Sequence, residues 1–341
     1  MVKKMKLKFL FLSFVLIFLA NTSLAKSLNI NAIKSRQLVA CGTSSDYKSL
    51  AYKKNGRLEG FDADICRALA SAIFDNSESF KLVYVNRNEI GKALISGKID
   101  IMLGHTSLAS TEEIYQNVIP VDTLYYDKQV FVARSETSAT SMNEFAKNKV
   151  CVLRNSNASV FLNEYNNKHA LGFNIIELPN LSALKETFYT NRCELASDSE
   201  IFINDFINVV SSEKPAQILP EIITYIPIKA YTSGNAPQLN SVFRQIINAL
   251  KLASSADITS QNIDIHMATK SLSIQNLLGI NQKPWLSMGL VPEWIKTFIS
   301  TSGNYMQILD RNIGRSSKLK IDNPQNNLTE KGGFFITQPF I

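Results

Sequence analysis

The feature that most constrains the fold is a strand–helix cycle that occurs twice along the chain. Short apolar runs predict its strands, at residues 37–41, 81–85 and 99–103 in the first cycle and at 149–153, 175–178 and 193–196 in the second. Apolar residues at helical spacing predict its helices, at 60–74 and 90–96 and then at 155–165 and 181–189. Because strands and helices alternate, we expect an α/β sheet with crossover helices.

Two extended segments link the cycles. Residues 125–134 have the composition of a long strand, and a second extended segment at 219–231 leads back toward a helix. We therefore expect two α/β lobes joined by two crossing strands, with a cleft between them. Lobe 1 is expected to span residues 26–130 and 232–341, including a C-terminal extension, and lobe 2 to span 131–231.

The position of the binding site follows from this architecture. Ligands of open α/β sheets bind beyond the carboxyl ends of the strands. In the first cycle these ends are the loops at residues 42–47 and 104–111, which are rich in Ser and Thr. We expect these loops to line the cleft.

The N-terminus has the organisation of a secretory signal peptide. Four lysines within the first eight residues precede an apolar run at 9–20 and the small-residue sequence Ser23-Leu24-Ala25. We predict cleavage after residue 25. The alternative is a retained anchor, although the apolar run is shorter than the ~20 residues that a membrane crossing needs.

Composition excludes several classes of function. The chain carries 36 Lys and Arg against 29 Asp and Glu, and without the four leader lysines its net charge falls from +7 to +3. Such a small excess argues against a nucleic-acid partner, because nucleic-acid surfaces carry clustered Lys and Arg. The histidines, His105, His169 and His266, form no ligand pattern and no Cys-x-x-Cys occurs, so we expect no metal and no cofactor.

Four cysteines, an even number, favour disulfides in an oxidising compartment. Three pairings of Cys41, Cys66, Cys151 and Cys193 are possible, and four buried free thiols are the alternative. We favour Cys41 with Cys66 and Cys151 with Cys193, because each pair then lies within one expected lobe and leaves hinge motion free.

Several runs resemble a known family. They are GFDADIC at 60–66, LISGKID at 94–100, the crossing strand, and a C-terminal segment with GNYMQILDRNIG at 303–314, followed by motifs at 319–321 and 331–333. Together they resemble the periplasmic amino-acid-binding proteins of ATP-driven (ABC) importers, and the C-terminal segment resembles the general L-amino-acid-binding branch. The cysteines also fall where that branch has cysteines.

The resemblance implies a type II periplasmic binding protein fold, a location in the periplasm and a membrane permease of an ABC importer as partner. The implied ligand is a small solute, an amino acid or a related polar compound. In the family, a lobe 1 arginine grips the ligand carboxylate, as its planar guanidinium makes two charge-assisted hydrogen bonds. That position is Glu112 here, which implies an altered ligand if Glu112 faces the cleft.

The second lobe departs from the family as well. The turn that contacts the carboxylate has become Arg154-Asn155-Ser156-Asn157, where Arg154 either replaces the missing cation or is solvated. The acid that holds the ligand amine corresponds to Asp198 with a one-residue gap, and to Ser199 without it. Asp198 is therefore either an amine anchor or a surface acid.

Four further lobe 1 residues are candidates for ligand contact, each with a structural alternative. Thr106 and Ser107 donate hydrogen bonds to a ligand or serve the turn at the end of a strand. His105 replaces a polar amide of the family and lies at the rim or against the ligand. Tyr47 is expected to cover an apolar side chain.

Three functions compete on this basis. The first is a transport receptor with an altered ligand, cationic if Glu112, Glu113 and Asp198 all face the cleft. The second is a degenerate exported protein that acts through its surface without binding a solute. The third is an enzyme, because some cyclohexadienyl dehydratases use this fold, but the chain shows no nucleophile–base pair, and we expect no catalysis.

Overall fold

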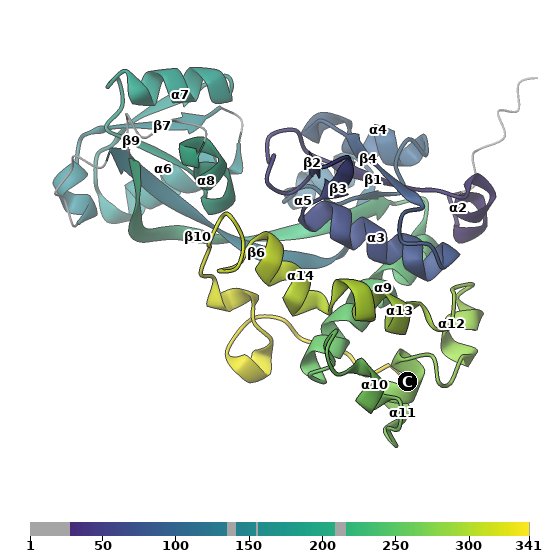
Figure 1. Ribbon diagram of the computed structural model, residues 1–341. Coiled ribbons are helices and arrows are strands. Elements are labelled where there is room, and N and C mark those ends of the chain that lie inside the picture. The colour runs from purple at the N-terminus through teal and green to yellow at the C-terminus, as the bar shows by residue number, and fades with distance from the viewer. Residues whose placement is uncertain (1–27, 135–140, 155, 209–215, 341) are drawn as a thin grey trace, which may run out of the picture.

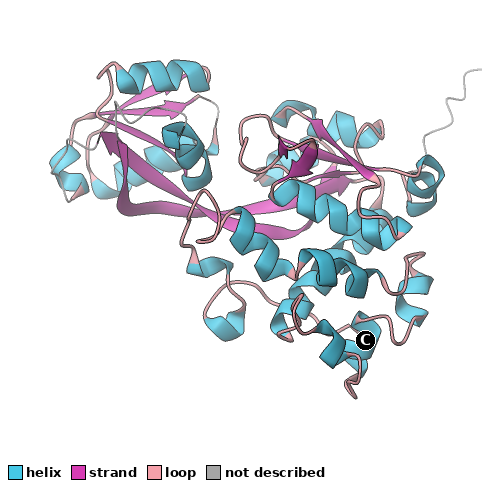
Figure 2. Ribbon diagram, in the orientation of Figure 1, coloured by secondary structure: helices cyan, strands magenta, loops and turns pink. Residues whose placement is uncertain are grey.

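The computed structural model describes residues 28–134, 141–154, 156–208 and 216–340, so the expected signal peptide lies outside the described residues. Two α/β units are connected by two long strands (Figures 1 and 2). The α/β fold with two crossing strands is thus confirmed. The residue boundaries of the lobes stay a prediction, and the terms lobe 1 and lobe 2 are used below as defined from the sequence.

One sheet of eight strands runs through both lobes, in the order β4-β1-β5-β10-β6-β9-β7-β8. Its lobe 1 strands are β1 (Val39–Thr43), β4 (Phe80–Tyr84) and β5 (Ile101–Met102), and its lobe 2 strands are β7 (Lys149–Leu153), β8 (Asn174–Leu178) and β9 (Leu195–Ser199). The antiparallel strands β6 (Val118–Arg134) and β10 (Ala216–Ser233) belong to both lobes. Lobe 1 also contains a small separate hairpin, formed by β2 (Tyr52–Lys54) and β3 (Arg57–Glu59).

Helices cover the sheet in both lobes. Lobe 1 contains α2 (Ile30–Arg36), α3 (Phe61–Phe74), α4 (Ile90–Ile95), α5 (Ser110–Tyr115) and α9 (Pro237–Ser255), and lobe 2 contains α6 (Asn157–His169), α7 (Leu181–Tyr189) and α8 (Glu200–Asn208). The C-terminal extension adds α10 (Ile263–His266), α11 (Leu272–Leu277), α12 (Lys283–Ser287), α13 (Trp294–Ser302) and α14 (Tyr305–Asn312). Across the described parts of the chain, none of these helices combines the length and hydropathy that a membrane crossing requires.

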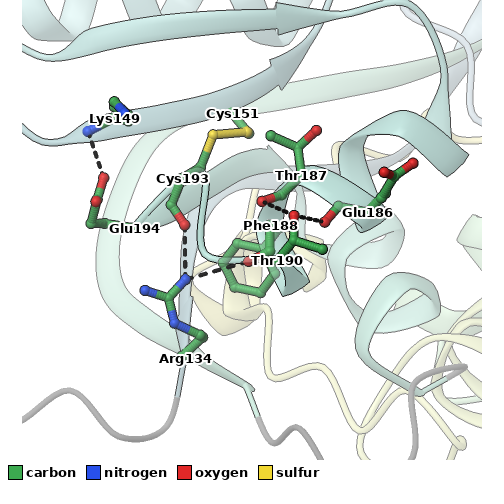
Figure 3. The surroundings of a disulfide bond; sticks show 9 residues. All are labelled: Arg134, Lys149, Cys151, Glu186, Thr187, Phe188, Thr190, Cys193 and Glu194. Carbon is green, nitrogen blue, oxygen red and sulfur yellow. Dashed lines mark hydrogen bonds between the residues drawn. A yellow bond between two sulfur atoms is a disulfide. The ribbon is translucent and has the colours of Figure 1, made fainter.

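Two disulfides confirm the favoured pairing. Cys41 in β1 is bonded to Cys66 in α3, and Cys151 in β7 is bonded to Cys193, which precedes β9. The first disulfide lies within lobe 1 and the second within lobe 2, so neither crosses the hinge. Near the second disulfide, Arg134 at the end of β6 donates from Nη1 to the Cys193 carbonyl at 2.8 Å, which ties the crossing strand to lobe 2 (Figure 3).

The crossing strands position the site. β6 pairs with β10 along almost its whole length, and β9 joins β6 only from Gln129 onward. The strand β6 therefore leaves lobe 1 before Gln129 and enters lobe 2 after it. The cleft opens beside this crossing, at the carboxyl ends of β1, β4 and β5.

Candidate functional site

A cavity of about 210 Å³ lies between the two lobes. Lobe 1 contributes the segments that follow β1, β4 and β5, as expected for a sheet of this type. Lobe 2 contributes the start of α6 and the end of β9. The side chains that line the cavity include Tyr47, Arg87, His105, Thr106, Ser156 and Asp198.

The lobes contact each other directly around this cavity. Asn157 at the start of α6 donates from Nδ2 to the Ser107 carbonyl at 2.8 Å. On another side, the backbone amide and the hydroxyl of Ser49 both donate to Oδ2 of Asp205 in α8, at 3.2 and 3.0 Å. The structure therefore has the lobes closed over the cavity.

Asp198, near the end of β9, is the buried acid of the cavity and is only 7% exposed. Burial is the main reason that its pKa is raised to about 7; Asp127 and Asp46 add to the rise, whereas the Ser199 amide and His105 oppose it. The Ser199 amide donates to Oδ1 at 2.7 Å. Among the described residues, no lysine or arginine forms an ion pair with Asp198.

A ring stack forms the wall next to Asp198. Tyr47 stacks on His105 with ring centroids 3.9 Å apart, and Nε2 of His105 lies 2.7 Å from Oδ2 of Asp127 in β6. Asp127 thus fixes the orientation of the imidazole, and the imidazole supports the tyrosine ring. Tyr47 also meets Phe202 of α8 edge to face, at 5.9 Å between centroids, so the stack reaches across to lobe 2.

Arg87 is a cavity residue that the sequence analysis missed. It begins the short 3-10 helix η1 (Arg87–Glu89) just after β4. Its Nε and Nη2 bond the two carboxylate oxygens of Glu112 in α5, at 3.0 and 2.6 Å, and Nη2 also donates to the Ser107 carbonyl at 2.9 Å. Its position at the carboxyl end of a strand was a usable signal, because ligand groups gather there.

Glu112 is held by Arg87. Partial burial alone raises the pKa of Glu112, but hydrogen bonds from Arg87 and from the Ala109 backbone outweigh burial and leave the pKa below its usual range. Glu112 therefore carries its negative charge at neutral pH, and that charge is matched by the guanidinium. Its side chain does not line the cavity.

The cavity brings together six of the eight residues that the sequence proposed: Tyr47, His105, Thr106, Ser107, Ser156 and Asp198. The other two, Glu112 and Arg154, do not line it, and Arg154 is exposed. Ser156 caps α6, because its hydroxyl accepts the Ser159 amide. Ligand contact by any of these residues stays a prediction. Among the described residues, no group of three or more His, Cys, Asp or Glu is placed to hold a metal ion.

Comparison with known proteins identifies the family. Residues 39–269 match the model of the bacterial extracellular solute-binding proteins, family 3. The chain therefore belongs to that family of solute-binding proteins, as its motifs indicated. The C-terminal extension lies mostly beyond the part that the family model matches.

Relatives of similar length support the amino-acid-binding branch. The chain is 28% identical to the general L-amino acid-binding periplasmic protein AapJ of Rhizobium johnstonii, over 93% of this chain and 94% of that protein. It is 23% identical to the glutamate/glutamine/aspartate/asparagine-binding protein BztA of Rhodobacter capsulatus, over 93% of this chain and 94% of that protein. These alignments extend past residue 269, so the relatives share the extension.

A solved structure matches the fold over nearly the whole chain. It is a periplasmic binding protein from Brucella ovis with glutathione bound, at a TM-score of 0.83 and 26% identity, covering 92% of this chain and 99% of that chain. A shorter neighbour, ArgBP from T. maritima, has a TM-score of 0.52 and 17% identity and covers 67% of this chain and 96% of its own. This second likeness shows the fold alone.

Proposed function

We propose that the protein is a periplasmic receptor of an ABC importer that captures a small solute carrying an ammonium group. The observation that carries this proposal is Asp198, a carboxylate buried in the closed cavity between the lobes with no ion-pair partner among the described residues. A buried charge requires a partner, and an ammonium group of the solute supplies one. Closure of the lobes over that solute presents the combined surface to the permease.

The relatives favour an amino acid or a small peptide as the solute. AapJ binds L-amino acids in general, and the Brucella protein holds glutathione. Each of these compounds has a free α-ammonium group. The cavity of about 210 Å³ is smaller than the roughly 300 to 1,000 Å³ of sites for drug-sized ligands, which favours a solute of amino-acid size.

Asp198 makes the proposal testable through pH. The pKa of Asp198 is about 7, and a bound ammonium favours the ionised carboxylate. Binding below pH 7 therefore releases a proton. We expect the affinity to be constant above pH 7 and to fall as the pH drops below 7, approaching tenfold per pH unit.

Isothermal titration calorimetry tests both points. Wild-type protein is titrated with L-alanine, L-glutamate, L-lysine and glutathione at pH 6.0 and 8.0, in buffers of different ionisation enthalpy that reveal the released proton. Asp198→Asn should weaken binding by roughly a hundredfold and abolish the proton release. Asp75→Asn makes the same chemical change at an exposed position of lobe 1 and should bind as wild type.

Two outcomes would overturn the proposal. If the folded protein binds no ammonium-bearing solute at pH 8.0, the alternative of an exported protein that acts through its surface replaces it. If Asp198→Asn binds as tightly as wild type, the ammonium is held elsewhere. We further propose that the solute leaves unchanged, which recovery of the intact solute after release by denaturation checks.

A further inference from the structure

A cationic side chain also lines the cavity, on the lobe opposite Asp198. We propose that Arg87, oriented by Glu112, binds the carboxylate of the solute, so that the ligand is an amino acid and not a simple amine. This inference rests on the proposed function, since it assigns the second pole of the same site. It places the carboxylate anchor 25 residues before the position where the resemblance implied one.

The geometry of the Arg87–Glu112 pair carries the argument. Two parallel hydrogen bonds, 3.0 and 2.6 Å long, join Nε and Nη2 of Arg87 to both oxygens of Glu112. Such a bidentate pair fixes the plane of the guanidinium as well as its position. The remaining nitrogen, Nη1, has no hydrogen-bond partner among the described residues, and Arg87 lines the cavity.

Burial indicates that this pair orients Arg87 more than it stabilises the fold. The side chains of Arg87 and Glu112 are 35% and 32% exposed, and ion pairs in such partly exposed positions contribute little to stability. Arg87 lines the cavity, whereas Glu112 does not. A solute therefore meets the guanidinium and not the carboxylate, which removes the like-charge repulsion expected from the sequence.

Closure of the lobes adds donors from lobe 2 next to Arg87. The Ser107 carbonyl accepts hydrogen bonds from Arg87 of lobe 1 and from Asn157 of lobe 2, at 2.9 and 2.8 Å. This shared acceptor places the first turn of α6 beside the guanidinium. The amino end of a 13-residue helix favours negative charge, so a carboxylate bound by Arg87 gains support from lobe 2.

Matched pairs of ligands test the inference. Each L-amino acid is compared with the amine that lacks only its α-carboxylate: L-lysine with cadaverine, L-glutamate with 4-aminobutanoate, and L-alanine with ethylamine. For wild type we expect the amino acid of the best-binding pair to bind roughly ten- to hundredfold more tightly than its amine. Arg87→Gln should bring this ratio near one while the affinity for the amine stays unchanged.

The two proposals fail in different ways. Loss of the Asp198 carboxylate weakens both members of a pair, whereas loss of Arg87 weakens only the amino acid. The present inference is overturned if wild type binds the amine as tightly as the amino acid, or if Arg87→Gln keeps the wild-type ratio. Either result leaves the assignment of Asp198 intact.

Glu112 is a positioning residue, and its role needs a separate readout. Glu112→Gln should lower the amino-acid-to-amine ratio by about three- to tenfold, and the double variant with Arg87→Gln should show no further loss, because Glu112 acts only through Arg87. Glu113→Gln is the matched control; its side chain bonds Lys229 and Tyr231 outside the cavity lining. A rise in amino-acid affinity in Glu112→Gln would show instead that Glu112 competes with the solute.

Discussion

The two lobes are built from the same strand–helix cycle, but they are stabilised differently. Lobe 1 shares one large apolar core with the C-terminal extension, whose Trp285 and Trp294 are fully buried and meet edge to face. Lobe 2 has two small apolar clusters, one on each face of its sheet, and Cys151 and Cys193 belong to one of them. A lobe with a small core depends more on covalent links than a lobe with a large one.

Removal of a disulfide should change the stability of the two lobes more than any other substitution considered below. The Cys151–Cys193 bond closes a loop with a sequence separation of 42, and the Cys41–Cys66 bond one of 25. In the chain-entropy model these contribute about 4 and 3.5 kcal/mol. We expect the double Cys→Ala variant in lobe 2 to unfold that lobe locally, whereas the variant in lobe 1 lowers the melting temperature without local unfolding.

Hydrogen exchange followed by mass spectrometry distinguishes these outcomes. The backbone amides of β7 and β9 should lose protection in the lobe 2 variant at temperatures where β1 and β4 remain protected. Because Arg134 and the Cys193 carbonyl meet beside this disulfide, the end of β6 should also exchange faster (Figure 3). Equal protection of both sheet halves in both variants would contradict the difference in lobe stability.

Each lobe contains a buried carboxyl group, and the two groups differ in their access to the cavity. Asp62 in α3 is 1% exposed; Thr43 donates to its Oδ2 at 2.6 Å, and its Oδ1 has no hydrogen-bond partner within the described chain. Burial raises its pKa to about 7, the same value as for Asp198. Asp198 lines the cavity, whereas Asp62 does not. A raised pKa therefore does not by itself identify a binding residue; access to a cavity does.

Asp62→Asn should stabilise the protein in a pH-dependent way. The folded pKa of Asp62 lies above its unfolded value of 3.8, so its protonated form stabilises the fold at low pH, and this stabilisation is lost as the pH rises toward 7. The side-chain amide that Asp62→Asn introduces does not ionise, so its contribution does not change with pH. We expect the variant to gain roughly 2 to 4 kcal/mol over wild type at pH 8 and nothing below pH 4.

Urea unfolding at several pH values measures this gain. Asp75→Asn, at an exposed position, should follow wild type throughout. A gain for Asp62→Asn that is the same at pH 4 and pH 8 would show that the carboxyl is not buried in its neutral form. Solute binding should be unaffected by this substitution, in contrast to Asp198→Asn.

The sequence predicted the repeated cycle, the crossing strands and the disulfide pairing, because these depend on apolar periodicity and on which cysteines share a lobe. It proposed Glu112 as a ligand contact, but Glu112 does not line the cavity and is paired with Arg87. Residues 104–111 were expected to be a loop, whereas α5 begins at Ser110 and turns Glu112 toward Arg87. A contact between positions 25 residues apart leaves no periodic signal, so the sequence did not indicate the Arg87–Glu112 pair. The place of Arg87 just after a strand was the one usable signal for its position at the cavity.

We expect the smallest change in stability from substitutions in the C-terminal extension, because it contacts the hinge through a few hydrogen bonds. Asn326 bonds the backbone of Tyr126 in β6 in both directions: its Nδ2 donates to the carbonyl at 2.8 Å and its Oδ1 accepts the amide at 2.6 Å. A side-chain amide has the donor and acceptor of a peptide group, so Asn326 takes the place of a neighbouring strand just before β9 joins β6.

Asn326→Ala should lower the free energy of unfolding by about 1 kcal/mol and make the Tyr126 amide exchange roughly fivefold faster. Asn323→Ala is the matched control, because it removes one bond, from Nδ2 to the same carbonyl, and leaves the Tyr126 amide paired with Asn326. Only the first variant should speed exchange at Tyr126. Wild-type exchange in both would mean that the extension packs on lobe 1 without restraining the hinge, and lobe 1 would then differ from lobe 2 only in the size of its core.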